Sequence, residues 1–378
     1  RASGGGATAA AAGGVGGVRG AAQAVALVRG LADGYRALCL YRCQDAIAHF
    51  QALPHAHYHT GYVLTQVGRA HFEMVQYAAA LRAFEQAQRI EPHRLAGMEI
   101  HSTILWHLKK EVALCHLAKR AVEVDRNSVY ACCVVGNCFS LQKEHDAALK
   151  FFNRASQLQP DFAYACTLAG HEHSAKEDFE KAMACYRSAV RIDERHYNAW
   201  YGLGNIYYRQ EKYDFAEHHL RKALAINPCS SPLFCYLGMA LHANQKSAQA
   251  SRRTDRSAPA RAHSDRCARR RQAIEMLSSA ITIDPKNPLA RFQKAQVLLS
   301  MDEYEPALAE LTTLVDMAPK EGSVYFVLGR VYKKLGQPAK AMVNLTRALD
   351  LSPKDAQQIK AAILNLERED NGEEEEEL

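Results

Sequence analysis

The apolar residues of this chain recur with a period of 34 residues. Short apolar segments ending in proline place Pro92, Pro160, Pro228, Pro285, Pro319 and Pro353 at successive intervals of 68, 68, 57, 34 and 34 residues. Every interval is a multiple of 34 except the third, which is 23 residues longer than one period. A fixed period of this length indicates a repeat protein in which each unit is one supersecondary motif.

A frame of 34 residues laid from Leu27 gives nine units, which begin at residues 27, 61, 95, 129, 163, 197, 231, 288 and 322. The eighth position is glycine in seven units, and the twentieth is alanine in eight. The twenty-fourth is mostly large and apolar, as at Phe50, Phe84, Phe152 and Tyr186. Small residues let two helices cross closely, so the frame predicts two antiparallel helices per unit, with proline ending the second.

No such unit can bury its apolar face alone, so the nine units are expected to stack into a right-handed superhelix. The pattern is that of the tetratricopeptide repeat (TPR), and the predicted fold class is an all-α TPR α-solenoid. The repeats should occupy residues 27–355. We expect a Gly/Ala-rich disordered linker at 1–26, a disordered basic insert at 247–271, a capping helix at 356–368 and an acidic tail at 369–378.

Composition narrows the function classes. The insert holds eight Arg and two Asp, and its net charge of +6 equals the net charge of all 378 residues. The rest of the chain therefore has no net charge, and no basic nucleic-acid-binding domain is predicted. No run of 18 apolar residues is present, so we expect no membrane span. The 11 cysteines include no CxxC pair and are interpreted as buried free thiols of an intracellular protein.

No catalytic motif was found, and we predict a protein that is not an enzyme and needs no cofactor. The densest group of possible metal ligands is His55, His57 and His59, which fall between the first two units. Solvated histidines are favoured there over a metal site, and no metal is predicted. Cys132, Cys133 and Cys138 lie on one predicted helix and are interpreted as packing residues rather than nucleophiles.

The chemistry of interest lies on the first helices of units three to six. In TPR units, frame positions 2, 5, 9, 12 and 13 line the concave face. Amides there can hold a peptide backbone, aromatic rings an apolar side chain, and a carboxylate a guanidinium. The candidate peptide-binding residues are Glu99, Trp106, Asn137, Tyr164, His171, Asn198, Tyr201 and Asn205.

Several segments resemble one TPR family in particular. They include MEIHSTILWHL at 98–108, RHYNAWYGLGNIYYRQEKYDFAEHHLRKALAINP at 195–228 and VYFVLGRVYKKLGQ at 324–337. These strings are similar to the subunit 3 TPR protein of the anaphase-promoting complex, or cyclosome, and the resemblance runs from about Leu27 to Leu366. The insert is not part of the family's pattern, and it is either a lineage-specific loop or an imperfect gene model.

The resemblance implies a non-catalytic scaffold of a cell-cycle ubiquitin ligase, found in the nucleus and cytoplasm. Proteins of this family bind C-terminal Ile-Arg tails of coactivators and core subunits, and they pack on other TPR subunits. They also form homodimers through an N-terminal half that is missing here. No nucleic acid or membrane is among the partners it implies.

Together these observations predict roles for individual residues. Glu99 would meet the arginine side chain of the tail, while Asn137 and Asn205 would hold its backbone and terminal carboxylate. Trp106, Tyr164 and Tyr201 would surround the isoleucine. The alternative is a chaperone-type TPR adaptor that binds acidic C-terminal peptides through a clamp of Lys and Arg around Asn. That clamp is incomplete, because Tyr201 stands where a lysine would be needed.

Overall fold

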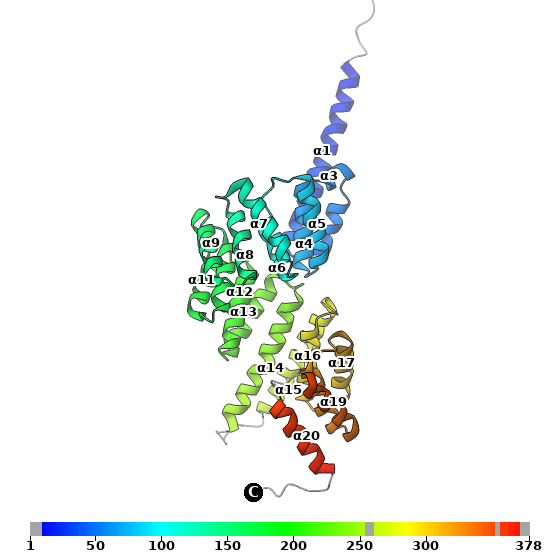
Figure 1. Cartoon of the computed structure of the whole chain (residues 1–378). Helices are drawn as coiled ribbons and strands as arrows, with labels where there is room; N and C mark the ends of the chain where they lie inside the picture. Colours follow the sequence, from blue (N-terminus) through cyan, green and yellow to red (C-terminus); the bar gives the residue numbers. More distant parts are fainter. Residues whose placement is uncertain (1–9, 254–260, 352–355, 371–378) are drawn as a thin grey trace, which may run out of the picture. The chain divides into compact units, whose positions relative to one another are not determined.

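The structure is a computed structural model that describes residues 10–253, 261–351 and 356–370, with side chains at 20–245, 268–351 and 356–366. It divides into two units (Figure 1). The first comprises residues 1–203 and 225–229, and the second comprises residues 204–224 and 230–378. Each unit is described by itself. All the regular secondary structure of the described residues is helical.

The first unit consists of antiparallel helix pairs in chain order. The pairs are α1 (Ala10–Cys39) and α2 (Cys43–Gln51), α4 (Gly61–Glu73) and α5 (Tyr77–Ile90), α6 (Met98–His107) and α7 (Glu111–Asp125), α8 (Val129–Leu141) and α9 (His145–Leu158), and α10 (Ala163–Ala175) and α11 (Phe179–Ile192). The short helix α3 (His55–Tyr58) joins the first two pairs, and α12 (Tyr197–Arg209) begins in this unit.

The second unit continues the same pattern. After the end of α12 it contains α13 (Tyr213–Ile226), α14 (Ser231–Arg253) with α15 (Arg261–Ile283), α16 (Pro288–Leu299) with α17 (Tyr304–Met317), α18 (Gly322–Lys334) with α19 (Pro338–Leu351), and α20 (Ala356–Asp370). Ile359 of α20 is fully buried and packs into the core of the last pair, with Leu328 and Leu345. This last helix therefore covers the apolar face that the ninth repeat would otherwise expose.

The small residues of the frame lie where the helices of a pair cross. Gly136 of α8 faces the ring of Phe152 of α9, and a Cβ atom added there would come within 2.3 Å of the ring. Ala148, at the twentieth position, is completely buried in the same core. Close approach of the two helices thus depends on a small residue opposite a large one, which confirms the TPR fold.

The first helices share a termination that the sequence pattern does not reveal. The fifteenth frame position has a left-handed backbone in eight repeats, at Tyr41, Val75, Lys109, Lys143, Glu177, Glu211, Asp302 and Gly336. In the fourth repeat the N–H of Glu144 bonds to the carbonyl of Phe139, and that of Lys143 bonds to Ser140. This is a Schellman-type cap, which normally favours glycine. Only one of the eight is glycine, so the others hold a costly conformation that the helix crossing stabilises.

The third repeat departs from the predicted frame. Its first helix, α6, begins at Met98 and not at Leu95, after Gly97 with a φ of 94°. The small residues of the frame are also replaced, because Ser102 stands at the eighth position instead of glycine and Leu114 stands at the twentieth instead of alanine. Leu114 is fully buried. The pair α6–α7 therefore packs with its large residue one helical turn earlier than the other pairs.

Three predicted boundaries differ from the structure. Residues 10–26, predicted as linker, belong to α1, whose alanine-rich sequence favours helix. Parts of the predicted disordered insert are helical, because α14 continues to Arg253 and α15 starts at Arg261. The final helix continues to Asp370 instead of ending at 368. Residues 1–9 and 254–260 and the acidic end from 371 lie outside the described residues.

Of the cysteines whose side chains are described, all except Cys235 lie in the first unit. The ten cysteines of the described side chains form no disulfide. Only Cys43, Cys132, Cys133 and Cys235 among them are buried, so the prediction of buried thiols was too broad.

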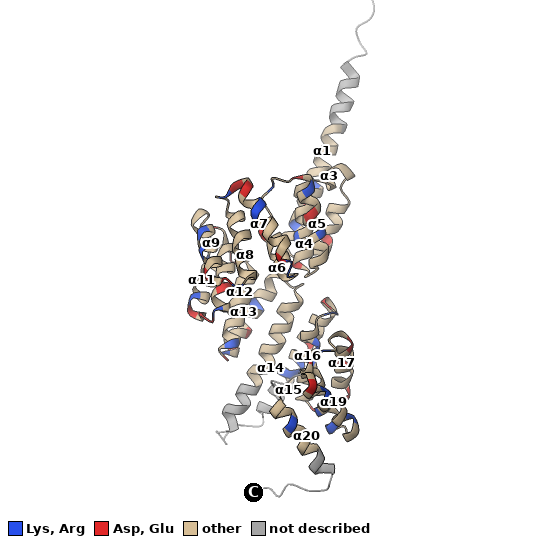
Figure 2. Cartoon of the chain, in the orientation of Figure 1, with Lys and Arg blue, Asp and Glu red and all other residues tan. Residues whose placement is uncertain are grey.

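Figure 2 shows Lys and Arg interspersed with Asp and Glu over the drawn helices. Within the described part of the chain, no helix is both long and apolar enough to cross a membrane.

Candidate functional site

The first helices of successive repeats form a continuous surface in the first unit. Helices α4, α6, α8 and α10 contact one another in order, and we call the surface they form the inner face. Its polar side chains bond across one repeat length. Trp106 and Ser140 are 34 residues apart, as are Asn137 and Thr103. Equivalent positions of neighbouring repeats therefore hydrogen-bond to each other along the inner face.

Asn137 lies at the centre of this network and is only 4% exposed. Its Nδ2 donates to the hydroxyl of Ser102 at 2.8 Å and to that of Thr103 at 3.1 Å. The hydroxyl of Thr103 also shares a 2.7 Å hydrogen bond with that of Tyr164. Both amide protons of Asn137 are thus used within the protein, which leaves the carbonyl oxygen as the atom able to accept a further hydrogen bond.

A second group of bonds fixes the indole of Trp106. Its Nε1 donates to Ser140 at 3.1 Å, and Ser140 donates to Glu172 at 2.6 Å. The other carboxylate oxygen of Glu172 lies 2.7 Å from Nδ1 of His145. The ammonium of Lys109 lies 4.0 Å from the centre of the Trp106 ring. The half-buried indole is therefore held in one orientation by helices α8, α9 and α10.

Glu99 supplies a buried carboxyl group at the start of α6. It is 9% exposed, and its Oε2 accepts a 2.9 Å hydrogen bond from the N–H of Gly97. Burial raises the pKa of Glu99 to about 7, although the guanidinium of Arg69 and the N–H of Gly97 act in the opposite direction. The group is thus close to half ionised near neutral pH, and a further cation beside it would favour the carboxylate.

Within the first unit, the last residues of the inner face contact the first two repeats. The hydroxyl of Tyr197 donates to Glu73 of α4 at 2.7 Å across 124 residues, and the guanidinium of Arg195 donates to the carbonyl of Cys39 at 2.9 Å. Burial raises the pKa of Glu73, while its hydrogen bond with Tyr197 and the charge of Arg69 lower it. The start of the sixth repeat is thereby joined to the first and second repeats.

The structure brings four of the eight predicted residues into these arrangements. Asn137 and Tyr164 share one network, Trp106 lies in the adjacent one, and Glu99 lies one helical turn before Thr103. His171 is exposed, and its Nδ1 bonds to the hydroxyl of Tyr186 at 2.8 Å, outside both networks.

The remaining three predicted residues belong to α12. Asn198 and Tyr201 are half-buried in its first-unit part. Asn205 is half-buried in the part that belongs to the second unit, and it is therefore not assigned to the same site. The roles of all eight residues stay predictions.

Sequence reasoning missed three charged groups of this face: Arg69, Glu73 and Glu172. Arg69 and Glu73 occupy the ninth and thirteenth positions of the second repeat, so the frame could have found them had that repeat been included. Glu172 stands at a tenth position, which carries no such signal. Tyr197, at a first position, contacts Glu73 only because the repeats curve back on themselves.

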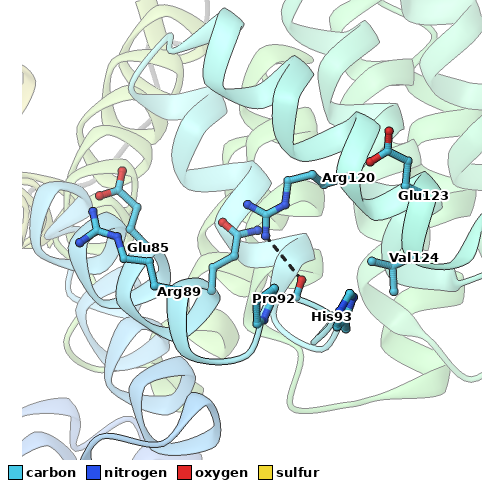
Figure 3. A pocket seen from close by; sticks show the side chains of 8 residues that line it. Glu85, Arg89, Pro92, His93, Arg120, Glu123 and Val124 are labelled. Carbon is cyan, nitrogen blue, oxygen red and sulfur yellow. Dashed lines mark hydrogen bonds between the residues drawn. The ribbon is translucent and has the colours of Figure 1, made fainter.

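A second feature is a hollow of about 790 Å³ between the second helices α5 and α7 and the loop between α5 and α6. It is lined by Glu85, Gln88, Arg89, Pro92, His93, Arg120, Glu123 and Val124 (Figure 3). Arg120 crosses it to bond the carbonyl of Pro92 at 3.5 Å. Its lining holds both charge signs, so it lacks a clear preference for an anion or a cation.

In the second unit, two cations of one helix share a carboxylate. Arg291 and Lys294 of α16 both contact the carboxylate of Glu310, at 2.9 and 2.8 Å. Among the residues that the structure describes, no group of three His, Cys, Asp or Glu side chains could hold a metal ion.

Comparison with known proteins places this architecture in a family. Models described as "Tetratricopeptide repeat" match residues 129–162, 197–228, 268–326 and 322–355, and one described as "TPR repeat" matches 170–211. The chain is 44% identical over 282 residues to cell division cycle protein 27 homolog B of Arabidopsis thaliana, covering 75% of this chain and 35% of that protein. It is 38% identical over 288 residues to anaphase-promoting complex subunit 3 of Schizosaccharomyces pombe, covering 76% and 40%.

The chain is a homologue of anaphase-promoting complex subunit 3. The human cell division cycle protein 27 homolog is 53% identical over 131 residues, which cover 35% of this chain and 16% of the human protein. This subunit 3 homologue thus spans at most about 40% of the length of the curated relatives named here.

A solved structure supports the fold of the subunit 3 homologue. The structure titled as the APC/C hetero-tetramer Cut9-Hcn1 superposes with a TM-score of 0.69 at 15% identity, covering 85% of this chain and 58% of that one. At this identity the likeness establishes the TPR solenoid alone.

Proposed function

We propose that this chain is a non-catalytic TPR scaffold of the anaphase-promoting complex that binds C-terminal Ile-Arg tails on the inner face of its first unit. The homology to subunit 3 supports the assignment to the complex. The observation that carries the binding proposal is that α6 holds both the buried carboxyl of Glu99 and the fixed indole of Trp106, while the neighbouring helix α8 holds the oriented amide of Asn137.

Each group of the tail has a matching group on this face. The guanidinium of the terminal arginine would pair with Glu99, since burial strengthens the attraction between the two charges. The isoleucine would contact the rings of Trp106 and Tyr164. The carbonyl oxygen of Asn137 would accept a backbone N–H of the tail, because both amide protons of Asn137 already bond to hydroxyls.

Other parts of the proposal follow from the homology. The chain would pack on other TPR subunits and support ubiquitination during mitotic progression in the nucleus and cytoplasm. Homodimerisation would involve segments outside the present sequence. An adaptor for acidic C-terminal peptides is the alternative, and the experiment below includes it.

The test is fluorescence anisotropy with a labelled peptide that ends in a free Ile-Arg. The controls are its amidated form, its form with alanine in place of the arginine, and an acidic peptide of equal length. We expect the first to bind best, and Glu99→Gln to weaken it about tenfold or more. Equal affinity for all four peptides, or a preference for the acidic one, would contradict the proposal.

A further inference from the structure

Two half-buried thiols meet where the third repeat packs against the fourth. Sγ of Cys115, on α7, lies 3.2 Å from Sγ of Cys138, on α8. We propose that this pair is a redox modification site, at which an oxidant of the peroxide class converts the two thiols into a reversible disulfide that links the two repeats. The inference goes beyond the proposed function and does not depend on it.

The distance between the two sulfurs is the main support. The S–S bond of a disulfide is about 2.0 Å long, so each sulfur has to move by only about 0.6 Å. Small rotations of the two side chains can supply this shift. The bond can therefore form on the native arrangement of α7 and α8.

The packing around the pair keeps the two sulfurs within reach of each other. Leu114 and Leu117 of α7 lie in the same buried cluster as Ala131 and Val134 of α8, and Cys138 packs against that cluster. A close-packed core allows little relative movement of the two helices. One thiol is thus held beside the other at a high effective concentration, and the bond between them should form faster than one with a thiol from solution.

The surroundings of the two sulfurs suggest different roles. Burial and the hydrogen bond with Cys115 raise the pKa of Cys138 to about 12, so Cys138 keeps its proton until the second step. Nε2 of Gln142 lies 4.0 Å from Sγ of Cys115 and can donate to a thiolate there. We therefore assign the first attack to Cys115 and the second to Cys138.

The reaction consumes one peroxide. The thiolate of Cys115 attacks a peroxide oxygen, the O–O bond breaks, and hydroxide leaves behind a sulfenic acid. Cys138 gives its proton to that hydroxide, attacks the sulfur of Cys115 and displaces the sulfenic oxygen as a second hydroxide, which the proton first released by Cys115 neutralises. Two thiols and one hydrogen peroxide thus give one disulfide and two waters. In a reducing compartment a dithiol would reverse the bond by exchange, becoming a disulfide itself.

Other cysteines of the same region lack this arrangement. Cys132 and Cys133 are buried and consecutive on α8, so their side chains point in different directions. Sγ of Cys166 lies 3.7 Å from the hydroxyl of Ser156. Oxidation should therefore produce one dominant disulfide.

The test is limited oxidation of the purified chain with hydrogen peroxide, alkylation of the remaining thiols in denaturant, and tryptic mapping without reduction. Trypsin places Cys115 in the peptide 111–119 and Cys138 in the peptide 127–143, together with Cys132 and Cys133. We expect these peptides to be joined with the loss of two hydrogen atoms, at least about tenfold more often than any other pair. Fragmentation should place the bond at Cys138, and dithiothreitol should separate the peptides.

Variants distinguish this pair from the other cysteines. Cys138→Ser should lose the link, whereas Cys166→Ser should keep it. The exposed Cys39 reports whether the oxidant has acted. An unlinked Cys115 in a sample whose Cys39 is oxidised, or a bond from Cys115 to another cysteine, would overturn the proposal.

Thermal unfolding checks that the native packing accommodates the bond. Oxidation should raise the unfolding midpoint of the unmodified protein by about 3–10 °C, because the link restricts the unfolded chain. The rise should be absent in Cys138→Ser. A lower midpoint after oxidation of the unmodified protein would show that the bond distorts the contact between α7 and α8, against the proposal.

Discussion

The third and fourth repeats have the same length in the sequence but are packed in different ways. In the fourth, Gly136 faces the large ring of Phe152, and Ala148 fills the position between. In the third, Ser102 replaces the glycine and the large buried residue is Leu114, one turn earlier. A repeat can thus keep its period while the sizes of its core residues are exchanged.

The repeat with the irregular packing is also the one that carries candidate binding residues. The third repeat holds Glu99 and Trp106 on its inner side, and its second helix borders the hollow around Arg120 on the other side. The fourth repeat mainly supplies supports, since Asn137 and Ser140 fix residues of α6. Departures from the repeat pattern are expected where function requires an arrangement that the regular motif does not provide.

The largest effect is predicted for two substitutions that give each repeat the core residue of the other. Leu114→Ala introduces the residue that the other eight repeats have at this position, yet it should lower the free energy of unfolding by about 2–5 kcal/mol, because it leaves a cavity. Ala148→Leu should cost about 1–3 kcal/mol by overpacking. Urea unfolding measures both, and stabilisation by Leu114→Ala would show that the third repeat packs like the rest.

Next in size is a pH dependence that the third repeat has through Glu99. Its pKa is about 7 in the folded chain against an ordinary 4.5, so the folded state binds more protons between these values. Glu99 should therefore contribute a fall in the free energy of unfolding as pH rises from about 4.5 to 7, by up to about 3 kcal/mol. Buried histidines such as His101 and His196, whose pKa values burial lowers to about 4, contribute a rise over the same range. Glu99→Gln should remove the contribution of Glu99, so its free energy of unfolding should rise relative to that of the unmodified protein between pH 4.5 and 7, whereas the curve of Glu85→Gln, changed at an exposed site, should stay parallel to it. Parallel curves for all three proteins would contradict the burial of Glu99.

A smaller effect tests the regular packing of the fourth repeat. Gly136→Ala should lower the free energy of unfolding by about 1–3 kcal/mol, because the new methyl group meets the buried ring of Phe152. Gly20→Ala is the matched control, since a methyl group there meets nothing within 4 Å. Thermal unfolding followed by circular dichroism compares the two. An unchanged midpoint in Gly136→Ala would mean that the helices do not cross there.

The smallest effect concerns a feature that the two repeats share. Lys109 and Lys143 both have a left-handed backbone, so replacing either with glycine should stabilise the chain by about 0.5–1 kcal/mol. The gain should be smaller for Lys109→Gly, because this variant also loses the contact of the ammonium with Trp106. Gly336→Ala provides the reverse control and should destabilise. Loss of stability in Lys143→Gly would show that the cap is not strained.

Much of the fold was predictable because it depends on local and periodic features. The glycine and alanine positions gave the helix crossings, and the prolines gave the ends of the second helices. The frame failed at Leu95, where α6 starts three residues late, since an irregular first turn changes neither the repeat length nor its apolar spacing. It also gave no sign of the left-handed residues, because seven of the eight are not glycine.

The sequence by itself determined the number of repeats, their register and the side of each helix that faces the interior, because the 34-residue period fixes which positions pack. Only the tertiary structure decided which polar groups remain available to a ligand. Asn137 and Arg69 both belong to the inner face, but the amide protons of Asn137 are used by Ser102 and Thr103, while Arg69 has no hydrogen-bond or ion-pair partner among the described side chains. Hydrogen bonding between residues one or more repeats apart depends on the curvature of the solenoid, which no single repeat encodes.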